Sequence, residues 1–371
     1  MLNFFFLNSI SILNCIFFNL IFFFFKFFLR KKILFFFFAR KKLVGTTSYY
    51  IQDLLKNLKK NYIVFYGVDS FFFNNKYHVI LQKYFNYIFF VDIFLSNYLS
   101  EKVIKSKVRI YLHHDIYDTP IVSRNNERYL VKVLSNYNYI FVSSKSSQLI
   151  FSDLFNKYKN KSHVTFKIIK YPKIEYFYKN KVHYLIKNII VIAPTNIYSF
   201  KKISLVSYLD KLITYILKTT NYKIVFRPHP SNINDAKINF YLKKFINNKR
   251  FFYDTSYNYQ KTYSESKLMI TDLSGTAYTY ALIFNKPVIF FIPKTSKYSL
   301  RNNFNLNSNY FRDMNSIGSV ASNFQSIYRF LKKYKNNKKL FVNRIKLLKK
   351  RSDSPFRSKK TVADEINKLF K

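Results

Sequence analysis

Residues 4–29 form the longest apolar stretch of the sequence, and only Asn, Ser and Cys residues and Lys26 interrupt it. A helix of this length rises about 1.5 Å per residue, enough to cross the roughly 30 Å hydrocarbon core of a bilayer. Basic residues follow at 30–32 and, after a short apolar run, at 40–42. We therefore interpret residues 1–44 as a membrane anchor with a basic flank, which keeps the body of the protein on the cytoplasmic face.

Other interpretations of this stretch stay open. Its asparagines and Lys26 weaken a transmembrane span, and an interfacial helix held on anionic lipid by the basic flank fits the same pattern. A wrongly assigned start or a mobile tail is a third interpretation. A cleaved signal peptide is not indicated, because no basic segment precedes the apolar stretch and no Ala-x-Ala site follows it.

After residue 45, short apolar runs alternate with helical stretches. The predicted strands are 62–66, 78–81, 87–91, 108–112, 139–142 and 164–169, and the predicted helices are 51–60, 127–135 and 147–157. Strands that alternate with helices are typical of an α/β domain with a mostly parallel sheet. We assign this first domain, the acceptor side of the molecule, to residues 45–180.

The same alternation restarts after a lysine-rich stretch near 171–187. The predicted strands are 189–193, 223–227, 251–253, 268–271 and 287–291, with helices at 205–218 and 277–284. A second α/β domain is therefore assigned to residues 181–322, and residues 323–371 are predicted to be a basic helical tail. In two such domains, ligands are expected in the crevice beyond the carboxyl ends of the strands.

Composition narrows the class of protein. Lys and Arg number 63 against 18 Asp and Glu, a net charge of +45, but 44 Phe, 33 Tyr and no Trp indicate drift toward a narrow codon set. No groove-reading motif accompanies the lysines, so we expect no nucleic-acid partner. The charge fits an anionic membrane surface or a phosphorylated substrate. One cysteine excludes a disulfide framework, and four scattered glycines exclude a Walker or dinucleotide-binding loop.

The strongest motif of the second half is Arg-Pro-His-Pro at 227–230, directly after a predicted strand. Two prolines stiffen the loop, so Arg227 and His229 are held at the strand end. Arg offers a planar fork of donors and His one further donor, which suits a phosphate group. A plain proline turn with an incidental histidine is the alternative.

The next strand runs into Asp272-Leu273-Ser274-Gly275-Thr276 and then an apolar helix. Ser274 and Thr276 stand at a helix start, where free backbone N–H groups and the helix dipole favour an anion. Gly275 allows a ligand to approach the backbone closely. Capping alone would also explain these residues, but the nearby Arg-Pro-His-Pro loop strengthens the interpretation as a phosphate site.

In the first domain, the strand at 108–112 ends in His113-His114-Asp115. A histidine beside a carboxylate can act as a general base, with the acid orienting the ring. A metal site lacks a third convincing ligand, and an ordinary hydrogen-bonded loop is the other alternative. We expect no metal and no cofactor.

These motifs together resemble the CDP-glycerol glycerophosphotransferase family, whose members have the two-domain GT-B fold of glycosyltransferases. The resemblance rests on Ala-Pro-Thr at 193–195, Arg-Pro-His-Pro at 227–230, the Thr271–Thr276 turn, and Lys-Pro at 286–287, and it covers residues 105–295. It implies two facing Rossmann-like domains, with His114, or its neighbour His113, deprotonating the acceptor hydroxyl. Arg227, His229 and the turn from Asp272 through Ser274, Gly275 and Thr276 would hold the diphosphate of the donor, with His229 also counted as catalytic.

The resemblance predicts a membrane-associated transferase of surface polysaccharide biosynthesis, of the teichoic acid kind. It would move glycerophosphate or a sugar from a nucleotide-diphosphate donor, CDP-glycerol or a nucleotide sugar, to a hydroxyl of a polysaccharide or lipid-linked acceptor. One departure stands out: a family carboxylate falls at Thr279. The alternative is therefore a catalytically inactive homologue that acts as a scaffold in polysaccharide assembly.

Overall fold

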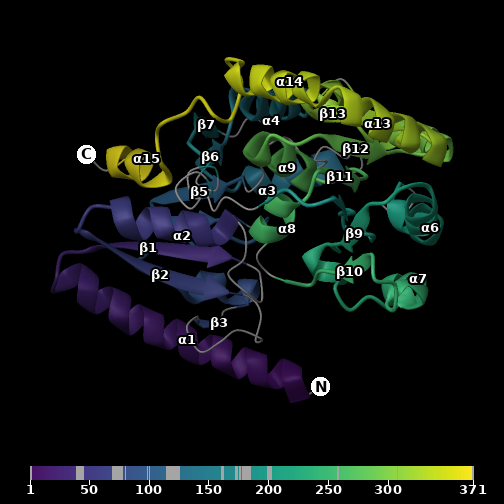
Figure 1. Ribbon diagram of the computed structural model, residues 1–371. Helices are drawn as coiled ribbons and strands as arrows, with labels where there is room; N and C mark the ends of the chain where they lie inside the picture. The colour runs from purple at the N-terminus through teal and green to yellow at the C-terminus, as the bar shows by residue number, and fades with distance from the viewer. Residues whose placement is uncertain are drawn as a thin grey trace. The chain divides into compact units, whose positions relative to one another are not determined.

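The computed structural model describes residues 2–38, 46–68, 78–79, 81–97, 99, 101–113, 126–159, 163–171, 174, 177, 185–198, 203–256, 259–306 and 308–369. The chain divides into two compact units, each built of helices around a parallel sheet (Figure 1). The first unit comprises Met1–His114, Glu127–Tyr176 and Arg357–Lys371, and the second comprises Asp115–Asn126 and Phe177–Phe356.

The sheet of the first unit has seven parallel strands within the described residues, in the order β3-β2-β1-β4-β5-β6-β7. They are β1 (Lys32–Phe38), β2 (Tyr62–Val68), β3 (His78–Val79), β4 (Ile93–Ser96), β5 (Val108–Leu112), β6 (Tyr139–Val142) and β7 (Thr165–Ile168). The helices of the unit are α1 (Leu2–Phe27), η1 (Gln82–Tyr87), α2 (Thr46–Asn57), α3 (Glu127–Leu134), α4 (Lys145–Lys157) and α15 (Val362–Leu369). The order 3-2-1-4-5-6 at its centre is that of a Rossmann sheet.

Strand β1 corrects the assignment of residues 1–44 to a membrane anchor and its flank. Leu34 pairs with Val64 on one side and with Ile93 on the other, so β1 lies inside the sheet. Leu34, Phe36 and Phe38 pack with α2 and α15, while the ring of Phe35 meets α1. A strand covered on both faces is apolar throughout and shows no alternation of polar and apolar residues. In the sequence, β1 could therefore not be distinguished from the apolar stretch before it.

The predicted strand at 87–91 is also corrected, to β4 at Ile93–Ser96. Residues up to Tyr87 form the 3-10 helix η1, and Phe90 has φ 66°, in the left-handed region that interrupts an extended run. The aromatic residues there are accordingly turned outward, and Tyr87 and Phe89 are both exposed.

The second unit contains a six-stranded parallel sheet in the order β10-β9-β8-β11-β12-β13 within the described residues. Its strands are β8 (Ile189–Ile192), β9 (Lys223–Phe226), β10 (Phe251–Tyr253), β11 (Leu268–Thr271), β12 (Val288–Phe291) and β13 (Gly318–Ala321). The α-helices around it are α6 (Leu209–Thr219), α7 (Ala236–Leu242), α8 (Gln260–Glu265), α9 (Thr276–Phe284), α10 (Lys297–Asn303), α11 (Asn309–Arg312), α12 (Met314–Ile317), α13 (Phe324–Asn336) and α14 (Lys338–Lys350). Short 3-10 helices are η4 (Leu205–Tyr208), η5 (Pro230–Asn232), η6 (Lys243–Phe245) and η7 (Lys294–Ser296).

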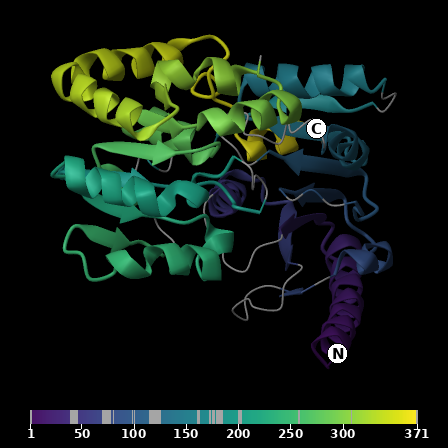
Figure 2. The ribbon, with the colours of Figure 1, turned by 90° about the vertical axis from the view of Figure 1, so that its right-hand side faces the viewer.

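Residues 323–371 do not form a separate tail. Ile327 and Phe330 of α13 and Phe341 of α14 belong to the buried core of the second unit, whereas Ile366 of α15 is buried in the first. The lysines of these amphipathic helices lie on the faces turned away from the core, and Figure 2 shows α13 and α14 as neighbouring yellow helices at its upper left. The edge strand β13 was not predicted, because Gly-Ser-Val-Ala has little of the β-branched and aromatic character of a strand. Gly318 is suited to its position, since a Cβ atom there would lie 1.7 Å from the Val288 carbonyl oxygen.

Candidate active site

The strand order of the second unit reverses between β8 and β11, which lie side by side in the sheet. After β8 the chain continues to β9 on one side of the pair, and after β11 it continues to β12 on the other side. Open α/β sheets bind ligands beyond the carboxyl ends of the strands at such a switch point. The segment from Ala193 to Asn196 follows β8, and the turn from Asp272 to Gly275 follows β11. Both predicted motif segments therefore stand at the switch point of this unit.

Asp272 ties these segments together. Its fully buried carboxylate accepts the backbone N–H of Thr195 at 2.8 Å and that of Leu205 at 2.9 Å. The neighbouring Thr271 hydroxyl donates to the Ala193 carbonyl oxygen at 2.5 Å. Burial raises the pKa of Asp272 to about 6, against the lowering effect of these amide donors. The carboxylate thus orders the loops at the carboxyl ends of β8 and β11.

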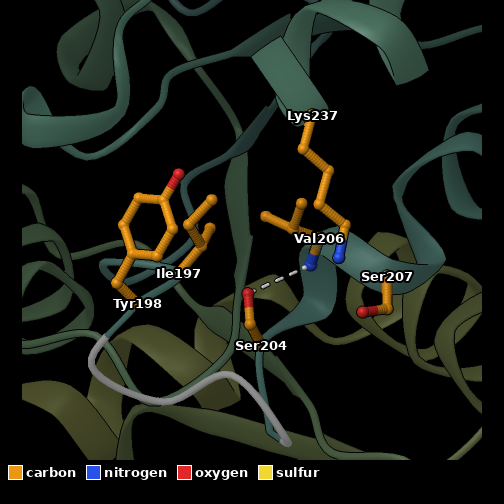
Figure 3. Close-up of a pocket in the computed structure, with 6 residues that line it drawn as sticks. All are labelled: Ile197, Tyr198, Ser204, Val206, Ser207 and Lys237. Carbon is orange, nitrogen blue, oxygen red and sulfur yellow. Dashed lines mark hydrogen bonds between the residues drawn. The ribbon is translucent and has the colours of Figure 1, made fainter. Parts of the chain in front are cut away.

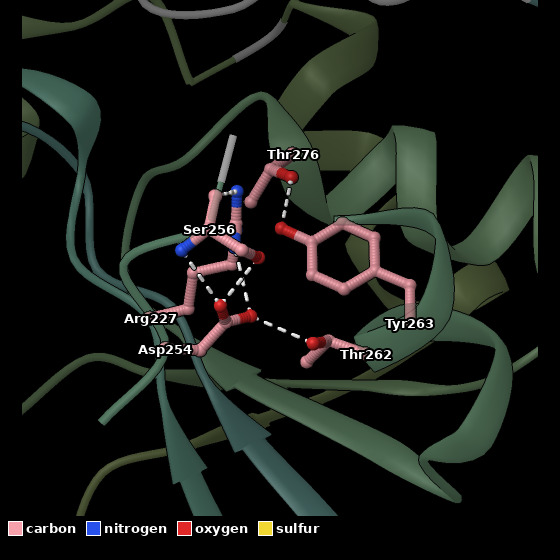
Figure 4. A network of polar contacts seen from close by, with 6 residues as sticks. All are labelled: Arg227, Asp254, Ser256, Thr262, Tyr263 and Thr276. Atoms are coloured by element: carbon pink, nitrogen blue, oxygen red, sulfur yellow. Dashed lines mark hydrogen bonds and ion pairs between the residues drawn. The ribbon is translucent and has the colours of Figure 1, made fainter. Parts of the chain in front are cut away.

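Arg227, at the end of β9, is held in a polar network (Figure 4). Its guanidinium donates to the Asp254 carboxylate at 2.8 Å and to the Ser256 carbonyl oxygen at 2.6 Å, and only 11% of its side chain is exposed. It also lies over the ring of Tyr259. Burial alone would raise the pKa of Asp254, but hydrogen bonds from Ser256 and Thr262 and the charge of Arg227 lower it overall.

The network extends through α8 to the start of α9. Asp254 accepts the hydroxyl of Thr262 at 2.6 Å, and the next residue, Tyr263, shares a 2.7 Å hydrogen bond with the hydroxyl of Thr276. Burial raises the pKa of Tyr263, and the nearby charge of Arg227 opposes that shift. The loop that follows β9 and the turn that follows β11 are therefore joined, as Figure 4 shows.

His229 is fixed by its own loop. Its Nδ1 accepts the backbone N–H of Ser231 at 3.2 Å, at the start of the short helix η5. A ring that accepts at Nδ1 carries its proton at Nε2 when neutral, so the opposite edge of the half-buried ring is a hydrogen-bond donor. Asn232 accepts the N–H of Ile197 at 3.3 Å, which ties this loop to the segment after β8.

The first turn of α9 has no side-chain cap. Gly275 precedes the helix with φ −63° and ψ −22°, angles that any residue adopts. What the glycine contributes is thus the missing side chain, which leaves the backbone accessible. Ser274 is buried beside it, and its carbonyl oxygen accepts the Tyr310 hydroxyl at 3.3 Å.

Lys286 is a supporting residue to which sequence reasoning gave no role. Its buried ammonium donates to the carbonyl oxygens of Tyr263 at 2.8 Å and of Ser264 and Ser266 at 2.5 Å. A cation at the carboxyl end of α8 complements the helix dipole. Burial lowers the pKa of Lys286 to about 7. The Lys-Pro motif thereby holds the helix that carries Thr262 and Tyr263.

A small pocket lies between the segment after β8 and the start of α7 (Figure 3). It is lined by Ile197, Tyr198, Ser204, Val206, Ser207 and Lys237. The Ser204 hydroxyl accepts the Val206 N–H at 3.3 Å, directly before Leu205, which Asp272 holds. The pocket thus borders the segment that Asp272 orders, and it offers one cationic side chain, Lys237.

The two predicted first-unit histidines have different outcomes. His113 follows β5 and is buried, with its ring 5.3 Å from that of Phe151 and its carbonyl oxygen bound by the Tyr50 hydroxyl at 2.8 Å. His114 lies outside the described residues. Thr279, at the position of the family carboxylate, is buried in α9. In the part of the chain that the structure describes, no three His, Cys, Asp or Glu side chains gather to hold a metal ion.

Comparison with known proteins agrees with these features. A profile of the CDP-Glycerol:Poly(glycerophosphate) glycerophosphotransferase family matches residues 18–354. The minor teichoic acid biosynthesis protein GgaB of Bacillus subtilis (strain 168) is 30% identical over 132 residues, which are 35% of this chain and only 13% of GgaB.

Solved structures share the fold. The wall teichoic acid polymerase TagF superimposes with a TM-score of 0.63 at 17% identity, over 91% of this chain and 88% of that one. MnaA of S. aureus, in a co-structure with UDP, gives a TM-score of 0.61 at 13% identity, over 91% of this chain and 96% of MnaA. Two Rossmann-like units of the GT-B kind are therefore confirmed. Because the family profile extends over most of its length, the chain belongs to the CDP-glycerol:poly(glycerophosphate) glycerophosphotransferase family.

Proposed function

We propose that this protein transfers glycerol phosphate from CDP-glycerol to a hydroxyl group of a teichoic acid-like, lipid-linked or polymeric acceptor. One observation carries the proposal: the Arg-Pro-His-Pro loop and the start of α9 belong to one hydrogen-bonded network, from Arg227 through Asp254 and α8 to Thr276, in a chain of this family. The donor diphosphate binds at the carboxyl edge of the second sheet, beside this network.

The proposed donor site combines four sources of positive potential. His229 offers its Nε2–H, the uncapped start of α9 offers backbone N–H groups, and the helix dipole adds a partial positive charge. Arg227 contributes its charge while its guanidinium is held by Asp254. Donors fixed in advance at the leaving phosphate stabilise the charge that develops there, by roughly 3 kcal/mol for each donor.

In the transfer step, the acceptor oxygen forms a bond to the β-phosphorus of the donor. The bond from that phosphorus to the bridging oxygen breaks, and CMP leaves with the electron pair. The acceptor proton passes to a general base, for which the family resemblance indicates His114. His113 is a positioning residue in this proposal, because its ring packs against Phe151.

The named relatives support this choice of donor. A TagF structure of the same fold was determined with CDPG, and the MnaA structure contains UDP, so both are linked to nucleotides. GgaB is a teichoic acid biosynthesis protein, which points to an anionic surface polymer as the acceptor class. For this chain we propose a membrane-associated enzyme on the cytoplasmic face, where the anionic leaflet attracts the basic residues after α1.

Calorimetry and a transfer assay test the proposal together. CDP-glycerol should bind the full chain more tightly than UDP, and CMP should be released when a synthetic lipid carrying glycerol phosphate is added. If CDP-glycerol does not bind at millimolar concentration and no CMP is released, the proposed activity is wrong and a scaffold role takes its place. Binding of CDP-glycerol without release of CMP would support the proposed donor but contradict the proposed acceptor.

A further inference from the structure

Helix α1 has two faces of different character, although both are apolar. Among described residues, it is the one helix that is long and apolar enough to cross a membrane. Ser11, Cys15, Phe18 and Phe22, spaced three or four residues apart, are buried. The rings of Phe18 and Phe22 lie against Phe35 of β1. One face of α1 is therefore part of the core of the first unit.

The opposite face is exposed and consists of large apolar side chains. Between 43% and 68% of each side chain is accessible in Leu13, Ile16, Phe17, Leu20 and Phe24, and in Phe28 directly after the helix; we call these six residues the α1 outer face. Soluble proteins rarely expose a contiguous apolar strip of this length, and such a strip marks an interaction surface.

The polar residues that interrupt the apolar stretch fasten α1 to the first unit. The Asn19 amide donates to the Tyr87 carbonyl oxygen and accepts the Phe89 N–H, both at 2.7 Å. The Lys26 ammonium forms a 3.0 Å ion pair with Asp92, whose other oxygen accepts the N–H of Ile33 at 3.0 Å. A helix fixed in this way along the sheet cannot cross a bilayer without leaving its core.

The segment after η1 extends the same surface. The ring of Phe90 meets the rings of Phe23 and Phe27, at 5.8 and 5.9 Å between centroids. Tyr87 and Phe89 of this segment are 59% and 51% exposed. Two segments of the first unit, far apart in sequence, thus contribute aromatic side chains to one apolar surface.

Basic residues adjoin this surface. Arg30 follows the helix and is exposed, Lys31 donates to the Lys60 carbonyl oxygen at 3.0 Å, and Lys83 is exposed on η1. Aromatic and aliphatic side chains beside cations are the combination that binds an anionic lipid surface, where the apolar part enters the acyl boundary and the cations meet the headgroups. A protein partner would call for polar complementarity that the α1 outer face does not offer.

We propose that the α1 outer face, together with Tyr87 and Phe89, lies in the plane of an anionic bilayer, so that α1 rests on the membrane and does not span it. The first unit is thereby held as a monotopic membrane protein through its own core helix. This inference goes beyond the transferase activity and does not depend on it, because it concerns only the first unit and lipid.

Vesicle sedimentation of the full chain tests the surface. Leu20→Asp should reduce partitioning onto phosphatidylcholine/phosphatidylglycerol vesicles at least about tenfold, because the exposed leucine no longer enters the acyl boundary and a negative charge stands in its place. The matched control is Leu149→Asp, an exposed leucine on α4 of the same unit, which should partition like the wild type. Equal partitioning of both variants and the wild type would overturn the proposal. CDP-glycerol binding is measured on the same Leu20→Asp variant. An unchanged affinity would show that the loss of vesicle binding does not come from damage to the donor site.

Depth measurement distinguishes a flat helix from a spanning one. With Cys15 replaced by Ala, spin labels at Leu13, Leu20 and Phe28 should report nearly equal, shallow immersion on the same vesicles. A spanning helix would instead place Leu13 and Phe28 about 22 Å apart along the membrane normal, at 1.5 Å per residue. That second pattern would refute the interfacial orientation even if vesicle binding is retained.

Discussion

The Asp272 carboxylate accepts the backbone N–H of Thr195 at 2.8 Å, although 77 residues separate them in sequence. This bond, with the parallel one to Leu205, fixes the segment after β8 to the turn after β11 at the switch point of the sheet. The carboxylate is fully buried and has no cationic partner among its closest contacts, only amide and hydroxyl donors. Its ionisation therefore opposes folding more than an exposed aspartate would.

Stability should consequently depend on pH through Asp272. Its pKa is about 6 in the folded protein and 3.8 as its ordinary value, so the folded state binds the proton more tightly. The free energy of unfolding should fall as pH rises from about 4 to about 6, by an amount on the order of 3 kcal/mol, and stay level above that. Urea unfolding at a series of pH values measures this.

Two variants isolate the contribution. Asp272→Asn keeps an acceptor oxygen without the charge, and should flatten the profile between pH 4 and 6. Asp153→Asn, at an exposed position on α4, should leave the wild-type profile in place. A profile of Asp272→Asn that parallels the wild type would show that this carboxylate does not titrate in that range.

The candidate site residues that the sequence offers are those that local chemistry marks. Arg227 and His229 between prolines, and Ser274 to Thr276 before an apolar helix, stand out because each motif follows a recognisable strand, and their roles stay predictions. Asp254 was not recognised as part of this region. The strand before it, β10, has only three residues, and the role of the Asp254 carboxylate is to bind Arg227, which is 27 residues away in sequence. Such a pairing exists only once the sheet has formed.

Similar reasons explain the errors in the fold. Strand β1 is apolar on both faces and follows directly after an apolar helix, so no change of periodicity marks where one ends and the other begins. The helices α13 and α14 carry many lysines but bury Phe330 and Phe341. The many lysines therefore indicated a basic tail, whereas the helical spacing of the apolar residues would have indicated that each helix has a buried face.

Arg227 and Asp254 should prove to be energetically coupled. Arg227→Ala leaves a largely buried carboxylate without its cation and should cost about 3–5 kcal/mol of unfolding free energy. The double variant Arg227→Ala with Asp254→Ala should recover much of that loss, since neither charge then remains unpaired. Chemical denaturation of the two single variants and the double variant gives the coupling energy.

The same three proteins show whether Arg227 acts on the donor as well. If its charge contributes to diphosphate binding, the double variant regains stability while its affinity for CDP-glycerol stays at least about tenfold weaker. Recovery of both stability and affinity would restrict Arg227 to supporting the loop. Calorimetry on the refolded double variant separates the two outcomes.

Lys286→Met should destabilise the second unit by an amount on the order of 3 kcal/mol. The substitution keeps the length of the side chain but leaves the carbonyl oxygens of Tyr263, Ser264 and Ser266 without their cationic donor. Lys261→Met, at an exposed position on the same helix α8, is the control and should change stability little. Thermal unfolding of the two variants, measured at pH 6.5, makes the comparison.

The pH dependence of Lys286 has the opposite sign to that of Asp272. Burial lowers its pKa to about 7 in the folded state from 10.5, so the unfolded chain binds the proton more tightly between these values. Stability from this group should rise as pH increases from about 7 toward 10, and the rise should be absent in Lys286→Met. An identical slope in both proteins would mean that the ammonium keeps its proton throughout.

His229→Ala should lower turnover of CDP-glycerol at least about tenfold without unfolding the protein. The ring is half-buried, and its Nδ1 accepts the Ser231 N–H in a bond within its own surface loop, so its removal should cost little stability. Its Nε2–H, in contrast, is a donor fixed beside the proposed diphosphate site, and loss of such a donor raises the barrier. His163→Ala, at an exposed position, serves as the histidine control. A reduced kcat with an unchanged melting temperature in His229→Ala alone would support donor stabilisation in the transition state, whereas wild-type turnover in both variants would remove His229 from the mechanism.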